Sequence, residues 1–226
     1  ELAAILDRRL RFHVERVDVA HAAVGPEQNA IHVARPHLRL LRNRRLGLEH
    51  LRNLQVLEGA QVTAIADPHP DSRDWARFLA AEEGDDLVAF ESHTELVASG
   101  LCDAVVVATP NMTHAAVLDD LLPTNLHILV EKPLAATPDE GLRLAIAARD
   151  SGVPVQVGHI ERFNPAVREL TRLLAGGALC SVYAITSRRA GPFPARIRDV
   201  GVTIDLATHD ADILCLVAGQ RPVRVS

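Results

Sequence analysis

Lys132 is the residue whose chemistry stands out first. It is the only lysine in 226 residues, because the other 23 of the 24 Lys and Arg side chains are arginine. An ammonium group can give up its proton, whereas a guanidinium effectively cannot. Two interpretations stay open on this residue alone: Lys132 donates a hydrogen bond or moves a proton at a reacting centre, or it forms an ordinary strand-end ion pair with Glu131.

A second candidate pair lies in the stretch 201–209, which reads Gly-Val-Thr-Ile-Asp-Leu-Ala-Thr-His. Asp205 and His209 are four residues apart, so a helix would place both on one face. A histidine with a pKa near neutrality suits proton transfer. The alternative is a surface pair that stabilises its helix only modestly.

The elements that must position these groups follow from hydrophobic patterning. Short apolar runs predict strands at 61–67, 87–90, 103–108, 127–130 and 153–157, and a further strand is expected at 180–189. Helices are expected between them, over 46–57 and 68–84, after a capping box at Ser92, from an Asn111 cap to Leu122, after Thr137, and from Asn164 to Leu174. Strands that alternate with helices predict a doubly wound parallel α/β sheet.

Ligands of such a sheet bind beyond the carboxyl ends of its strands. Seven residues lie at or just after a predicted strand end and therefore share one edge: Asp67, Thr109, Pro110, Asn111, Glu131, Lys132 and His159. A carboxylate that ends the second strand can hold the ribose hydroxyls of a dinucleotide, although a turn aspartate before Pro68 is the alternative for Asp67. Because its negative charge would repel a 2′-phosphate, Asp67 favours NAD over NADP.

The first loop of the sheet does not match the usual phosphate-binding pattern. A dinucleotide fingerprint needs three glycines before and within the first helix. If Gly47 is the third glycine of this fingerprint, the first two glycines should stand at positions 42 and 44. Arginine occupies both positions, as Arg42 and Arg44. Either this loop does not bind phosphate, or the residues before about 45 are not native to the fold.

Composition excludes several classes of protein. The chain is 48% hydrophobic and 23% charged with a net charge of -5, as expected for a soluble globular protein without a nucleic-acid partner. No apolar run reaches the length of a membrane span, and the charged first ten residues do not resemble a signal peptide. Cys102, Cys180 and Cys215 are widely spaced and form no metal or disulfide pattern, so we expect a cytoplasmic protein without a metal site.

Three ordered motifs resemble the Gfo/Idh/MocA family of NAD(P)-dependent sugar and polyol dehydrogenases. They are Asp103–His114 (DAVVVATPNMTH), Val130–Ala135 (VEKPLA) and Val157–Pro165 (VGHIERFNP). The third is similar to members that oxidise the 3-hydroxyl of UDP-N-acetylhexosamines. The resemblance implies a hydride transfer between a sugar or nucleotide-sugar hydroxyl and a nicotinamide.

The resemblance also implies roles for individual residues. Lys132, Asp205 and His209 are expected at the reacting hydroxyl, where Lys132 stabilises the alkoxide, His209 moves the proton and Asp205 orients the substrate or the imidazole. Cofactor contacts are expected from Gly47, Asp67, Thr109, Pro110, Asn111, His114, Glu131 and Lys132. Substrate contacts are expected from His159, Arg162 and Asn164.

The predicted organisation has three parts: an atypical leader over 1–44, a Rossmann-like dinucleotide-binding domain over 45–160, and the start of an α+β substrate and oligomerisation domain over 161–226. Family members continue beyond residue 226, so an incomplete second domain is expected, and homo-oligomers are expected of the full-length family. Arg42, Arg44 and the early end favour the alternative function, a non-catalytic or defective homologue with impaired cofactor binding.

Overall fold

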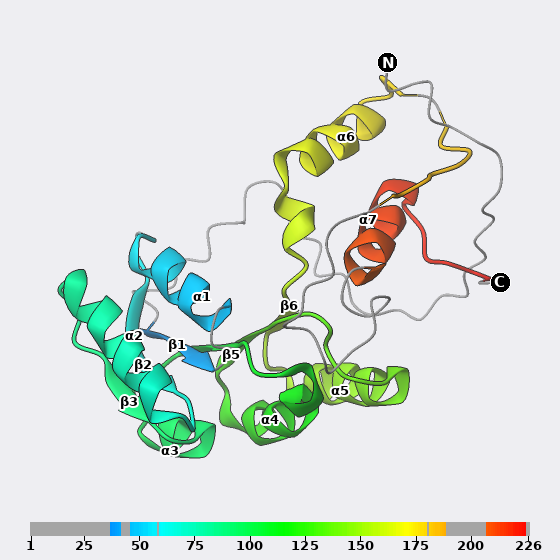
Figure 1. Cartoon of the computed structure of the whole chain (residues 1–226). Coiled ribbons are helices and arrows are strands. Elements are labelled where there is room, and N and C mark those ends of the chain that lie inside the picture. The colour runs from blue at the N-terminus through cyan, green and yellow to red at the C-terminus, as the bar shows by residue number, and fades with distance from the viewer. Residues whose placement is uncertain (1–36, 42–45, 58, 180, 189–206, 225–226) are drawn as a thin grey trace. The chain divides into compact units, whose positions relative to one another are not determined.

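The computed structural model describes residues 37–41, 46–57, 59–179, 181–188 and 207–224 (Figure 1). These residues divide into two compact units, of which the first ends at Gly158 and the second begins at His159.

A six-stranded parallel sheet forms the centre of the first unit, in the order β3-β2-β1-β4-β5-β6. Its strands are β1 (His37–Leu41), β2 (Gln61–Ala66), β3 (Val88–Phe90), β4 (Ala104–Val107), β5 (His127–Val130) and β6 (Val155–Val157). This is the strand order of the doubly wound dinucleotide-binding fold, so the predicted fold class is confirmed. The order reverses between β1 and β4, whose carboxyl ends therefore flank the point where such folds bind ligands.

Helices cover both faces of this sheet (Figure 1): α1 (Leu46–Gln55), α2 (Pro70–Glu82), α3 (His93–Ala98), α4 (His114–Leu121) and α5 (Pro138–Ser151). Alternate side chains of a strand point to opposite faces of the sheet. Because both faces are covered at β4, its valine side chains are all buried and its sequence is continuously apolar. Val105 and Val107 join a core with Leu118 of α4. Val106 joins the other core, with Leu51 of α1. Full burial of each such side chain stabilises the fold by about 1.5–3 kcal/mol.

Strand β1 lies between β2 and β4 although it falls within the predicted leader. Its sequence, His-Leu-Arg-Leu-Leu, contains two residues that are uncommon in a central strand. β1 therefore belongs to the sheet although it precedes residue 45.

Three of the four predicted helix N-caps, Ser92, Thr137 and Asn164, are confirmed. Ser92 and Glu95 form the expected capping box, and the Thr137 side chain accepts a hydrogen bond from the Glu140 N–H. The prediction that Asn111 caps a helix to Leu122 is wrong. Asn111 instead begins the 3-10 helix η2 (Asn111–Thr113), because the Thr113 N–H donates to the Pro110 carbonyl at 2.8 Å and closes a tighter turn before α4 begins.

The elements described in the second unit are all helices: η4 (Ile160–Phe163), α6 (Pro165–Ala175) and α7 (Thr208–Ala218). The first unit also contains the 3-10 helix η3 (Leu122–Thr124). The strand expected over 180–189 is absent from its described residues, 181–188. A strand needs a neighbour to accept its backbone hydrogen bonds, and no described strand pairs with this segment. None of the described helices is long and apolar enough to span a bilayer.

Candidate functional site

The carboxyl ends of the parallel strands bring the predicted polar residues of the first unit to one edge. Asp67 directly follows β2, Thr109 lies two residues after β4, and Glu131 and Lys132 directly follow β5. His159 lies two residues after β6 but begins the second unit. The grouping expected from the sequence therefore holds for the residues of the first unit.

Glu131 is the buried acid of this edge. Its side chain is 10% exposed, and its Oε1 lies 2.7 Å from His50 Nε2. Its Oε2 accepts the Lys132 backbone N–H at 3.3 Å. A Cβ atom at Gly158 would come within 3.2 Å of the same Oε2, so a glycine there lets the end of β6 lie against the carboxylate. The Lys132–Pro133 peptide bond is cis.

His50 is a residue of this site that the sequence interpretation missed. It lies on α1 and shares one helical face with the buried Gly47 and Leu51. A polar side chain on the buried face of a helix indicates a buried partner, and this was the available signal. The partner itself, Glu131, lies 81 residues further along the chain, which no local pattern reveals.

His114 is completely buried, with 0% of its surface exposed. Its Nδ1 lies 2.7 Å from the Pro133 carbonyl oxygen, and its Nε2 lies 3.0 Å from the Thr109 carbonyl oxygen. Both ring nitrogens therefore contact the protein backbone. The cofactor contact predicted for His114 stays a prediction. What the geometry shows is that the imidazole contacts both the segment after β4 and the segment after β5.

The segment after β4 carries a feature that fits a bound cofactor. The Thr109 hydroxyl is buried and has no hydrogen-bond partner within the described part of the chain. A buried hydroxyl without a partner costs free energy, so a ligand group at this switch point would stabilise it. Pro110 is exposed and Asn111 is half-buried beside it. These residues therefore suit the nicotinamide dinucleotide that the motifs imply.

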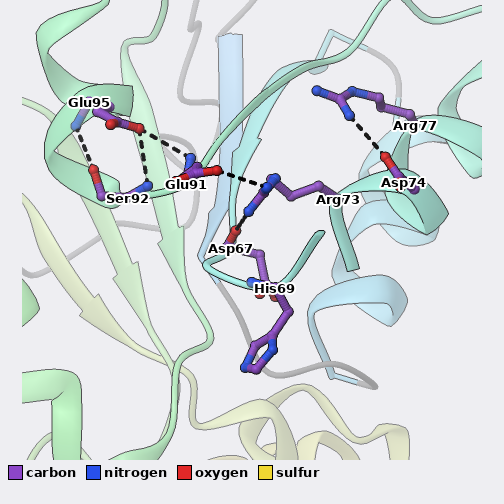
Figure 2. Close-up of polar contacts among 8 residues, drawn as sticks. All are labelled: Asp67, His69, Arg73, Asp74, Arg77, Glu91, Ser92 and Glu95. Carbon is purple, nitrogen blue, oxygen red and sulfur yellow. Dashed lines mark hydrogen bonds and ion pairs between the residues drawn. The ribbon is translucent and has the colours of Figure 1, made fainter. Parts of the chain in front are cut away.

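Asp67 directly follows β2, and the side chain of Arg73, on α2, reaches its backbone (Figure 2). Asp67 is 5% exposed, and its Oδ1 accepts the His69 backbone N–H at 2.8 Å, which is the turn geometry considered as the alternative for this residue. Arg73 donates to the Asp67 backbone carbonyl at 2.7 Å and to the Glu91 carboxylate at 3.1 Å. The guanidinium nearest in sequence to Asp67 is thus already paired.

Two of the expected substrate residues of the second unit contact Asp212. Arg162 binds this carboxylate through two nitrogens, with Nη2 2.6 Å from Oδ1 and Nε 2.8 Å from Oδ2. His159 Nδ1 lies 3.6 Å from Oδ2. Asn164 instead caps α6, because its Oδ1 accepts the Ala166 N–H at 3.0 Å.

Burial and charge shift the pKa values of this cluster. Burial lowers the pKa of His159, an effect that the Asp212 carboxylate opposes and the Arg162 cation reinforces. The hydrogen bond to Asp212 raises the pKa of Arg162. Burial, with the nearby Asp212 carboxylate, raises the pKa of the Cys215 thiol.

The remaining predicted residues are Gly47, His209 and Asp205. Gly47 is buried in the first turn of α1, and His209 is half-buried in the first turn of α7. Asp205 lies outside the described residues, as do Arg42 and Arg44. Among the described residues, no group of three or more His, Cys, Asp or Glu side chains could hold a metal ion.

Comparison with known proteins identifies the family of this fold. Residues 44–159 match the family model GFO_IDH_MocA, an oxidoreductase family with an NAD-binding Rossmann fold. UDP-N-acetylglucosamine 3-dehydrogenase of Acidithiobacillus ferrooxidans is 31% identical over 180 residues, which are 80% of this chain and 55% of that protein. Inositol 2-dehydrogenase 1 of Saccharopolyspora erythraea is 35% identical over 185 residues, which are 80% of this chain and 54% of that protein.

Solved structures show the same fold. The scyllo-inositol dehydrogenase from Lactobacillus casei, with bound NAD(H) and scyllo-inositol, matches with a TM-score of 0.68 at 21% identity. The match covers 82% of this chain and 56% of that one. The chain therefore spans about half the length of the relatives that it matches.

Proposed function

Because the chain belongs to the Gfo/Idh/MocA family of oxidoreductases with an NAD-binding Rossmann fold, we propose that it transfers a hydride between a sugar or nucleotide-sugar hydroxyl and a nicotinamide cofactor. The observation that carries the proposal is the position of Lys132, which directly follows β5 on the edge where doubly wound sheets bind ligands. The similarity to a UDP-N-acetylglucosamine 3-dehydrogenase and to inositol dehydrogenases supports the substrate class.

In this proposal the bound cofactor supplies the hydride acceptor, and the chain aligns the substrate and moves one proton. Lys132 donates a hydrogen bond to the oxygen of the reacting carbinol and stabilises its developing negative charge. His209 takes the hydroxyl proton, and Asp205 orients the substrate or the imidazole. Thr109, Pro110 and Asn111 contact the dinucleotide with Gly47, Glu131 and His114, while His159, Arg162 and Asn164 contribute to substrate binding.

Asp67 makes NAD the proposed cofactor rather than NADP. Its carboxylate ends β2, where a dinucleotide fold holds the ribose hydroxyls of the adenosine. A 2′-phosphate at this position would meet the negative charges of Asp67 and of Glu91, which is paired with Arg73.

A non-catalytic homologue is the second candidate function, and one observation favours it. Arg42 and Arg44 occupy the positions where a dinucleotide fingerprint has its first two glycines. Side chains of this size would fill the space that the pyrophosphate needs beside the first helix.

Titration with NADH separates the two candidates. We expect NADH fluorescence to change on addition of the purified chain with a dissociation constant in the micromolar range, about 1 μM to 1 mM. The first candidate also requires reduction of NAD by UDP-N-acetylglucosamine or an inositol. An absence of NADH binding at millimolar concentrations would favour the non-catalytic homologue.

Lys132→Ala tests the chemical role of the lysine. We expect turnover to fall by about 100-fold or more, because the loss of one preorganised hydrogen-bond donor to the oxyanion costs roughly 10²–10³ in kcat. Lys132→Arg keeps the positive charge but should restore turnover only in part, because the planar guanidinium presents its donors in a different geometry from the compact ammonium. Unchanged turnover in Lys132→Ala would exclude this mechanism.

A further inference from the structure

Lys132 lies between two residues, Glu131 and Pro133, that histidines from two different helices contact. On one side, His50 of α1 contacts the Glu131 carboxylate at 2.7 Å. On the other, His114 of α4 contacts the Pro133 carbonyl at 2.7 Å. The two contacts are independent, since they involve different helices and different groups of the strand end.

The contact with His50 fixes the residue before the lysine. Glu131 is 7% exposed, and a carboxylate removed from water needs hydrogen-bond donors. His50 Nε2 supplies one of these donors, and the Lys132 N–H supplies another at 3.3 Å. The same carboxylate therefore connects α1 to the backbone of Lys132. In addition, the Glu131 N–H donates to the Val107 carbonyl at 2.9 Å and ties this point to β4.

The contact with His114 fixes the residue after the lysine. Carbonyl oxygens only accept hydrogen bonds, so a ring N–H of His114 can donate to the carbonyl of Pro133 or of Thr109, and both carbonyls lie within 3.0 Å of the ring nitrogens. His114 thereby joins the ends of β4 and β5, the second of which carries Lys132.

We propose that His50 and His114 are positioning residues, which hold Glu131 and Pro133 so that the Lys132 side chain is presented at the carboxyl edge of the sheet. This inference rests on the proposed function for its catalytic meaning. The positioning of the lysine itself is testable without turnover.

The single lysine makes a direct test possible. Reductive methylation with ¹³C-formaldehyde labels Lys132 as the only lysine of the chain, and the α-amino group is recognised because it titrates near pH 8, well below a typical lysine. In His50→Ala and in His114→Ala we expect the dimethyl-lysine resonance to shift towards that of the unfolded chain and to sharpen as the side chain gains freedom. His50→Gln keeps a donor towards Glu131 and should return the resonance towards its position in the unmodified sequence.

His93→Ala is the matched control. His93 Nε2 also lies 2.7 Å from a carboxylate, that of Asp120, but this pair is exposed on α3 and α4. We expect this variant to leave the Lys132 resonance unchanged. Circular dichroism identifies folded variants. If His50→Ala does not fold, His50→Phe keeps a ring of similar size but has no donor towards Glu131, and the Lys132 resonance is expected to move in it as well.

Kinetics then separate positioning from binding. We expect kcat to fall by about 10- to 100-fold in His50→Ala, as for a small misplacement of a reacting group, while KM changes by less than about threefold. An unmoved Lys132 resonance in folded His50→Ala and His114→Ala would overturn the inference whatever the activity. A moved resonance in a protein without any turnover would support the positioning and count against the proposed function alone.

Discussion

Arg73 is the cation that a 2′-phosphate would need at the end of β2, and Glu91 already neutralises it. The Arg73 side chain is 13% exposed, whereas that of Glu91 is 74% exposed. The guanidinium also donates to the Asp67 backbone carbonyl, so it is held in place when the carboxylate is removed. Cofactor preference should therefore depend on the exposed partner of this pair (Figure 2).

Glu91→Gln should shift the cofactor preference towards NADPH. The substitution leaves a positive charge next to the expected 2′-position, and one exposed charge contributes about 1 kcal/mol or less. We expect the ratio of the NADPH and NADH dissociation constants to fall by up to about fivefold, measured by fluorescence titration at low salt.

Asp74→Asn is the control for this shift. Asp74 contacts Arg77 at 3.1 Å, which equals the Arg73–Glu91 distance, and lies on the same helix (Figure 2). The control changes the net charge by the same amount but at a pair further along α2. An equal shift in both variants would assign the effect to net charge and contradict the role of Glu91.

The site residues differ in how far the sequence alone predicts them. Glu131 and Lys132 are predictable because a strand end in a parallel sheet defines an edge. His50 is not, because its contact with Glu131, 81 residues away in the sequence, exists only once α1 packs on the sheet. His114 was found by its motif, but its bonds to two carbonyl groups depend on three segments that meet only in the fold.

At the scale of elements, the Thr137 cap gives a clear stability prediction. Thr137 accepts the Glu140 N–H at 3.3 Å at the start of α5, and α5 buries Leu144 against the sheet. Thr137→Ala should lower the free energy of unfolding of the first unit by about 1 kcal/mol, since an unsatisfied helix N–H remains.

Trp75 is the only tryptophan and belongs to the first unit, so its fluorescence during urea unfolding measures this loss. Thr137→Ser keeps the accepting oxygen and should retain most of the stability. An equal loss in the serine variant would show that the methyl group, and not the cap, is what matters.

Strands and helices were predictable where a local pattern is sufficient. The run of valines at 105–107 predicts a strand covered on both faces, and each valine is at most 1% exposed. Thr137 and Gly152 mark both ends of α5. Alternation at 181–188 was not sufficient, because a strand also requires a neighbour. Strand β1 is the opposite case. Its own sequence only weakly favours a strand, but it pairs with β2 on one side and with β4 on the other.

At the scale of the whole molecule, the two units that meet in sequence at Gly158 are stabilised by different kinds of interaction. The first unit has two apolar cores on either side of a sheet. The described residues of α6 and α7 include none that is fully buried, and η4 and α7 meet through the ion pair of Arg162 and Asp212. We therefore expect pH to affect the second unit more than the first.

His159 determines the direction of this pH effect. Burial lowers its pKa in the folded state below the ordinary value of 6.5. The unfolded chain then binds a proton more readily, so the stability of the unit is present above pH 6.5 and is lost as the pH falls through the lowered pKa. Above about pH 5 ordinary carboxylates remain ionised and do not contribute to this change.

Hydrogen exchange of α6 and α7 amides, corrected for intrinsic rates, should show weaker protection at about pH 5.5 than at about pH 7.5. His159→Gln carries no titrating group and should remove this difference, while His69→Gln, exposed in the first unit, should keep it. A larger loss of protection in acid for His159→Gln than for the unmodified chain would mean that the attraction of Asp212 for the imidazolium exceeds the cost of burial. The sign of the effect thus measures which of two opposing forces on one side chain is the stronger.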